Sequence, residues 1–207
     1  MINNLEKIKP LLKFNTAGDF YFVQILKRRK DNPGMKGDAR CIKNFYLYSI
    51  EELDSVWSEM IDLCSRHRAR AYIRLNVRNS DKIALMVLKK TADHIVSGNT
   101  RAVGHVYESV CGEHNSETQK KWIIDMDNVG EGDIEEVETL VRELWTEHEQ
   151  VGEFFAYLPT RNGLHIIVSP FNRFGFAEKL KHDVQMDNPT VLYIPDFPKV
   201  PENWVWA

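Results

Sequence analysis

Two acidic residues at the end of an apolar run could do chemistry. In the stretch WIIDMDN, Asp125 and Asp127 come directly after Trp122, Ile123 and Ile124. The run predicts a buried strand, where carboxylates are costly to desolvate, and the period of two places both acids on one face. Either they lie unliganded at an exposed strand end, or they share a divalent cation that offsets their repulsion. Hard oxygen donors at this spacing suit Mg²⁺ or Mn²⁺.

A second polar group follows about forty residues later, in TRNGLHIIVS. Arg161 supplies a guanidinium that can pair with a phosphate, and Gly163 permits close approach of a ligand to the backbone. Asn162 completes this turn, and His165 can donate a hydrogen bond to a phosphate oxygen. We therefore predict nucleotide-binding roles for these four residues.

The order of elements in the second half predicts how these groups meet. A strand at 122–127, a helix through 133–149, strands at 153–159 and 164–169, a helix through 173–182 and a strand at 190–195 follow one another. This β-α-β-β-α-β order is typical of the split βαβ or ferredoxin-like unit, in which the first and third strands are neighbours. His165 should then lie beside Asp125 and Asp127, on the open face opposite the helices.

The first half reads as an α/β lobe with a basic hairpin. We expect a hairpin within 18–49, a helix from a Ser49 cap to His67, a strand at 69–76 and a helix from a Ser80 cap to Gly98. Its positive charges suggest contacts with nucleic-acid phosphates, although solvation or surface ion pairs would explain them equally well. These candidates are the hairpin-tip residues Lys27, Arg28, Arg29 and Lys30, and Arg74 and Arg78 after the strand. The predicted fold is α/β (α+β): an N-terminal lobe, 1–115, packed as one unit on a catalytic core, 116–207.

The motifs WIIDMDN and RNGLHIIVSP resemble those of the archaeo-eukaryotic primase superfamily: hydrophobic-Asp-x-Asp and small-x-His. The resemblance covers about residues 120–195. It implies an RRM-like core, Asp125 and Asp127 as catalytic metal ligands for Mg²⁺ or Mn²⁺, and His165 as a contact to the nucleotide phosphates. It further implies a nucleotidyltransferase of DNA replication that takes a nucleoside triphosphate and a DNA or RNA template or primer, with a separately encoded helicase as a partner.

The third motif of that family, a hydrophobic residue followed by an acid, has three candidates. Asp187 follows Met186 and precedes the strand at 190–195, whose antiparallel pairing with the first strand would bring Asp187 to the site. We therefore expect Asp187 to be the third catalytic acid and metal ligand. Asp183 is its near rival, and Asp196 falls at the opposite end of that strand.

Composition limits the other classes of function. The net charge of −3 combines 18 Lys/Arg against 11 Asp/Glu in residues 1–100, which is +7, with 9 against 19 in residues 101–207, which is −10. The three cysteines and the lack of a signal-peptide pattern or membrane span predict a cytoplasmic protein with no membrane partner. One Cys-x-x-His pair is too few ligands for zinc, and no Walker loop is present. A catalytically silent nucleic-acid-binding relative and a metal-dependent nuclease remain the alternatives.

Overall fold

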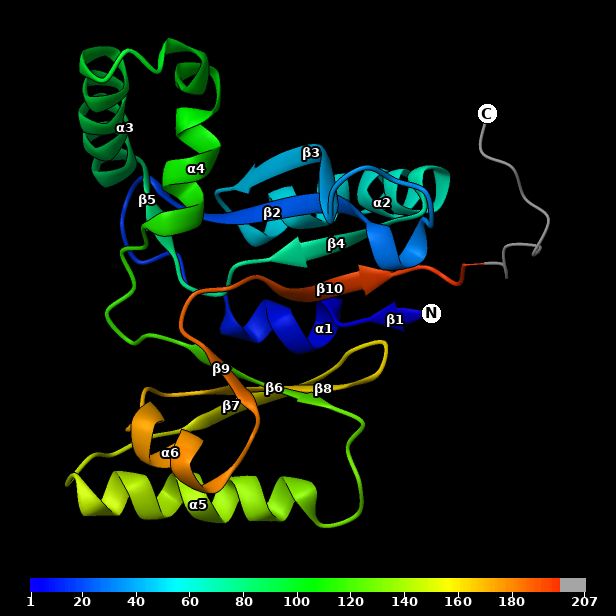
Figure 1. Cartoon of the computed structure of the whole chain (residues 1–207), viewed down its shortest axis with the longest axis vertical. Helices are drawn as coiled ribbons and strands as arrows, with labels where there is room; N and C mark the ends of the chain where they lie inside the picture. The colour runs from blue at the N-terminus through cyan, green and yellow to red at the C-terminus, as the bar shows by residue number, and fades with distance from the viewer. Residues whose placement is uncertain (198–207) are drawn as a thin grey trace.

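The predicted basic hairpin forms the longest strands of the molecule. β2 (Asp19–Arg28) pairs antiparallel with β3 (Ala39–Leu47), with Phe22 opposite Tyr46 and a register shift after Ile25. In this computed structural model, which describes residues 1–197, the hairpin belongs to the first of two antiparallel sheets (Figure 1).

The first sheet combines strands from both ends of the chain. Its order is β1-β10-β4-β2-β3, with β5 pairing β2. The remaining strands are β1 (Ile2–Asn3), β4 (Ala69–Ile73), β5 (Arg78–Asn79) and β10 (Thr190–Ile194). Every residue of β4 is buried, and this strand ends three residues before the predicted end at Asn76.

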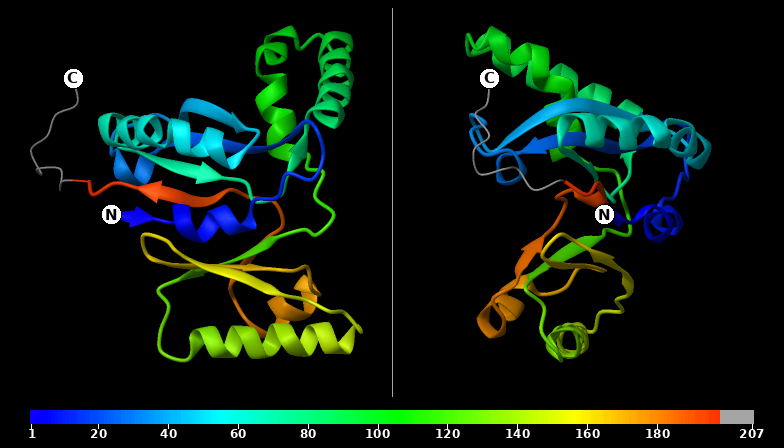
Figure 2. Two further views of the ribbon diagram at one scale, coloured as in Figure 1. Left: turned by 180° about the vertical axis from the view of Figure 1, so that it is seen from behind. Right: turned by 90° about the vertical axis from the view of Figure 1, so that its right-hand side faces the viewer.

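Four α-helices belong to this first part. They are α1 (Leu5–Ile8), α2 (Ile50–His67), α3 (Ser80–Val96) and α4 (Val106–Glu113). The Ser49 cap of α2 is confirmed by a 3.1 Å hydrogen bond from the Glu52 amide, whereas α3 is capped by Asn79 and not by Ser80. α3 and α4 form an arm that projects from the sheet (Figure 2). No helix within residues 1–197 has the length and apolar character to cross a membrane.

The second sheet has the order β7-β8-β6-β9, with all neighbours antiparallel. Its strands are β6 (Trp122–Asp127), β7 (Phe154–Pro159), β8 (Gly163–Val168) and β9 (Asp183–Gln185). One face packs on α5 (Asp133–Glu147) and α6 (Arg173–Lys179), because Ile124, Ile166 and Val168 alternate toward Val141 and Phe176.

The strand at 190–195 does not join this second sheet, so its predicted pairing with the first strand of the core is wrong. β10 pairs with β4 and β1 in the first sheet, and the three-residue β9 pairs with β6 instead. All five residues of β10 are buried, which suits an inner strand covered on both faces, while β9 is a partly exposed edge. The last ten residues of the predicted core, 198–207, lie outside the described residues.

The face of the second sheet that we expected to be open is partly covered. Ile123, Leu158 and Ile167 pack into the same core as Ile8 of α1 and Leu192 of β10. The buried side chain of Asn4 joins the two sheets, because its amide donates to the carbonyls of Pro159, at 3.0 Å, and Val191, at 2.9 Å. Figure 1 shows α1 between β10 of the first sheet and the strands of the second sheet.

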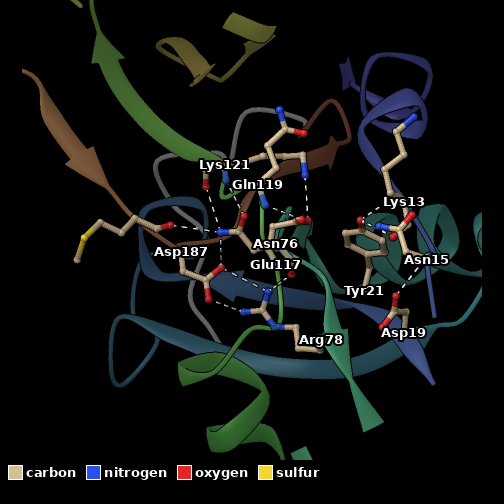
Figure 3. A network of polar contacts seen from close by, with 11 residues as sticks. Lys13, Asn15, Asp19, Tyr21, Asn76, Arg78, Glu117, Gln119, Lys121 and Asp187 are labelled. Atoms are coloured by element: carbon tan, nitrogen blue, oxygen red, sulfur yellow. Dashed lines mark hydrogen bonds and ion pairs between the residues drawn. The ribbon is translucent and has the colours of Figure 1, made fainter. Parts of the chain in front are cut away.

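A buried polar network fixes the chain where it returns from β9 to β10 (Figure 3). The carboxylate of Asp187 accepts from Arg78 Nη2 at 2.7 Å, Asn76 Nδ2 at 3.0 Å and Asn115 Nδ2 at 3.1 Å. Arg78 is fully buried, so its charge is compensated here and not by water. Asn76 also accepts from the Lys121 amide at 2.7 Å, which connects the network to the start of β6.

Replacing Asp187 by alanine should therefore destabilise the fold. The change leaves the Arg78 guanidinium buried without its carboxylate, at an expected cost of about 3–5 kcal/mol in the free energy of unfolding. Urea denaturation followed by tryptophan fluorescence measures it. Asp183→Ala, which removes an exposed carboxylate four residues earlier in the chain, should change stability by no more than about 0.5 kcal/mol. Equal stability of Asp187→Ala and the parent would refute this structural role.

Candidate functional site

A polar row crosses three strands of the second sheet. Asp125 on β6 is directly opposite His165 on β8 and directly opposite Asp183 on β9. Directly opposed residues in antiparallel strands project to the same face, so the three side chains share the face that also carries Ile123 and Ile167. The expected proximity of His165 and Asp125 is confirmed.

Both nitrogens of the His165 imidazole have partners. Nε2 lies 3.2 Å from Asp125 Oδ1, and Nδ1 lies 2.8 Å from the hydroxyl of Thr190, the first residue of β10. Thr190 is fully buried and His165 nearly so. The hydrogen bond from His165 holds the pKa of Asp125 below its usual value despite partial burial, so this carboxylate is ionised at neutral pH.

The row opens into a cavity of about 300 Å³ between the two sheets. Its second-sheet wall includes Asp125, Asp127 and His165. Its first-sheet wall includes the cations Arg28, Lys30 and Arg70, with Tyr72 and Val191 beside them. An acidic wall therefore faces a basic wall. A complex of a cation with a polyanion would match both.

The buried carboxylate of Asp31 joins the two walls. It pairs with Arg70 through two hydrogen bonds of 2.6 and 2.7 Å, and it also pairs with Arg161 on the turn between β7 and β8. The side chains of Asp31 and Arg70 are almost completely buried, whereas that of Arg161 is half exposed. Asp31 thus neutralises part of the basic wall and ties the hairpin to the second sheet.

The turn 160–163 brings its predicted residues to the cavity in different ways. Thr160, Arg161 and Asn162 line it. Gly163 is needed for the fold itself, because a Cβ at this position would lie 1.9 Å from the Met126 carbonyl oxygen of β6. The group that approaches Gly163 closely is therefore the neighbouring strand, and the expected approach of a ligand stays a prediction.

The structure separates the predicted acids into two places. Asp125 and Asp127 line the cavity, and Asp183 lies on the same face beside Asp125, whereas Asp187 is held in the Arg78 network and does not line the cavity. The expectation of Asp187 as third acid depended on pairing of β10 with β6, which does not occur. Asp196 is exposed and pairs with the amino terminus.

The residues predicted to contact nucleic acid lie in different parts of the structure. Arg28 and Lys30 line the cavity, while Lys27 lines a different depression with Arg40 and Lys43. Arg78 is fully buried and so is not placed to contact a nucleic acid, which corrects that prediction. Arg74 donates to the Asp187 carbonyl in the same network, and burial lowers the pKa of its guanidinium.

The carboxylate oxygens on the acidic wall are ligands of the type that Mg²⁺ and Mn²⁺ prefer. Within residues 1–197, no three His, Cys, Asp or Glu side chains lie close enough to hold a metal ion by themselves. Mg²⁺, however, commonly takes one or two carboxylates and completes its shell with water and substrate phosphates. The Gln185 amide already places a donor between two acids, because Nε2 lies 2.8 Å from Asp183 Oδ2 and 3.4 Å from Asp125 Oδ2. Asp125 and Asp127, which both line the cavity, are therefore the carboxylates that would hold a cation together with such phosphates.

Comparisons with protein-family models, curated proteins and solved structures find no match for this chain.

Several residues of the site carry no signal in the sequence. Asp31 follows the basic run KRRK and reads as a loop acid, and Arg70 reads as an exposed strand residue. Thr190 and Gln185 belong to segments whose partners depend on the strand order. Their proximity follows from contacts between segments far apart in the chain, which local patterns do not encode.

We expect Asp31→Ala to lower the free energy of unfolding by about 3–5 kcal/mol, because Arg70 would remain buried without a counter-charge. Arg161→Ala should cost less than about 1 kcal/mol, since that side chain is half exposed and water can solvate the surroundings. Urea denaturation of both variants measures the difference. Similar losses of stability for the two variants would show that the ion pair between Asp31 and Arg161, and not the compensation of buried Arg70, stabilises the contact between the hairpin and the second sheet.

Proposed function

We propose that this protein is a primase-polymerase-like nucleotidyltransferase that adds nucleotides to a nucleic-acid strand with Mg²⁺ or Mn²⁺. The observation that carries the proposal is the cavity in which Asp125, Asp127 and His165 face Arg28 and Lys30. A nucleoside triphosphate bound with a divalent cation has the charges that these two walls require.

The arrangement of the second sheet supports an RRM-like core. The sequence of elements is β6-α5-β7-β8-α6-β9, and the spatial order β7-β8-β6-β9 puts the first and third of these strands side by side. Both helices cover the same face, opposite the polar row. The resemblance to the archaeo-eukaryotic primase superfamily is consistent with this order, with β9 in place of the strand at 190–195 and Asp183 in place of Asp187.

In the proposed reaction a hydroxyl oxygen of the primer strand or of a first nucleotide bonds to the α-phosphorus. The bond from that phosphorus to the oxygen that bridges it to the β-phosphorus breaks, pyrophosphate leaves, and the hydroxyl proton passes to solvent. A divalent cation would neutralise the charge that develops on the phosphate oxygens. Arg28 and Lys30 would orient the polyphosphate.

His165 is the residue of the row with a proposed contact to phosphate. Its Nε2 is 3.2 Å from Asp125, at the long end of the usual hydrogen-bond range. A cation bound by Asp125 would compete for that oxygen and leave Nε2–H able to donate to a phosphate. Thr190 would keep the ring oriented through Nδ1.

A catalytically silent nucleotide-binding relative is the second candidate function. It is favoured by one observation, that Asp125 is already paired with His165 and accepts from Gln185 while three potential metal ligands do not converge within residues 1–197. Extension of a labelled primer in the presence of Mn²⁺ and nucleoside triphosphates separates an active enzyme from such a relative.

Titration calorimetry with Mn²⁺ and a nucleoside triphosphate should show that each strengthens binding of the other, because protein carboxylates and phosphate oxygens would share the cation. Asp127→Asn keeps the shape of an exposed side chain but removes its charge, and should weaken joint binding by about 1.5–3 kcal/mol. Asp81→Asn, an exposed acid at the start of α3, is the matched control and should have no effect. Binding of Mn²⁺ alone with high affinity would favour the nuclease, and binding of neither ligand would reject the proposal.

His165→Ala should weaken triphosphate affinity by about 1–3 kcal/mol, the usual contribution of a hydrogen bond to a charged group, and leave Mn²⁺ affinity unchanged. His105→Ala, an exposed histidine outside the cavity, is the control. Calorimetry on each variant gives both constants. If His165→Ala instead removes Mn²⁺ binding, histidine is a metal ligand and the phosphate contact is refuted.

A further inference from the structure

The tip of the β2–β3 hairpin has its own depression, next to the candidate site. It has a volume of about 660 Å³ and is lined by Arg28, Arg29, Lys30, Pro33, Gly34 and Asp38. Arg28 and Lys30 also line the cavity between the sheets, so the two hollows share a wall. Arg29 lines only the outer one.

The three cations of this depression are not neutralised by ion pairs within the described residues. Within residues 1–197, Arg28, Arg29 and Lys30 have no carboxylate at ion-pair distance, in contrast to Arg70 and Arg161, which Asp31 neutralises. The guanidinium of Arg28 lies over the Tyr72 ring, 5.9 Å from its centroid, and its buried Nε has no hydrogen-bond partner among these residues. Three positive charges therefore face a single acid, Asp38.

The loop that carries these charges is anchored from within. Asp31 pairs with buried Arg70, and Asn32, itself buried, donates to the carbonyls of Arg28 and Arg68 at 3.0 Å each. The residues between β2 and this anchor are thereby held at the mouth of the cavity. These two buried contacts fix the place at which the loop presents its cations.

We infer that this depression is a subsite for the sugar–phosphate backbone of a single nucleic-acid strand, continuous with the nucleotide cavity through Arg28 and Lys30. The inference extends the proposed function, and it rests on that function for the nucleoside triphosphate in the inner cavity. Phosphates nearest the reacting end would contact the two shared cations, and the next phosphate along the strand would contact Arg29. The polyphosphate of a nucleotide could also supply phosphates to these cations. A nucleotide held in the inner cavity would not contact Arg29, however, because Arg29 lines only the outer depression.

The test uses the full chain and a fluorescein-labelled single-stranded oligonucleotide, with affinity measured by anisotropy over a series of salt concentrations. Arg29→Ala should weaken binding about fivefold at 0.1 M salt and reduce the slope of log affinity against log salt by about 0.7, the value for one phosphate contact on a single strand. Nucleoside triphosphate affinity, measured by calorimetry, should not change. Arg28→Ala should weaken binding of both ligands.

Lys36→Ala is the matched control, because Lys36 is exposed on the same loop, carries the same charge and lines neither hollow. Equal losses for Lys36→Ala and Arg29→Ala would overturn the subsite, since binding would then follow net charge alone. A loss of triphosphate affinity in Arg29→Ala would assign the depression to the nucleotide instead and also overturn it. If the oligonucleotide depends on Arg29 but not on Lys36 while the parent protein binds no triphosphate, the subsite holds and the proposed function fails.

Discussion

The buried carboxylate of Asp31 is the interaction on which the geometry of the site depends. A carboxylate that loses its water must be compensated by charge, and Asp31 achieves this with Arg70 from the first sheet and Arg161 from the second. This pairing also fixes the position of the hairpin relative to the second sheet. The hairpin tip is held against the turn that precedes β8, so the basic side of the first sheet faces the acids on β6.

The same neutralisation decides which cations remain for a ligand. Of the four positive side chains that line the cavity, two belong to the Asp31 group and two, Arg28 and Lys30, do not. A cavity with four uncompensated cations would attract anions with little selectivity. Two free cations opposite Asp125 and Asp127 favour a ligand that carries both a metal and phosphates, which is why the proposed substrate is a nucleotide.

The Asp187 network has a comparable role at the other end of the interface between the sheets. It compensates the fully buried Arg78 and directs the chain from the edge of the second sheet into the first. Because β10 then supplies Thr190 to His165, the strand that leaves the second sheet still contributes to the site. The two sheets thus share one polar constellation, although each has its own covering helices.

The sequence by itself determined most of the longer elements and the faces of the two strands that carry the acids and His165. Alternation of apolar and polar residues indicated β6 and β8, and placed Asp125, Asp127 and His165 where they are found, because a period of two is a local property of an extended chain. It also indicated the hairpin and the cap of α2. Only the tertiary structure decided that residues 190–194 join the first sheet, that Asp183 and not Asp187 lies beside Asp125, and that the basic run divides between different hollows. These choices depend on which long-range pairing buries a strand completely and compensates a buried arginine. Asp187 and Arg78, for example, are 109 residues apart in the chain.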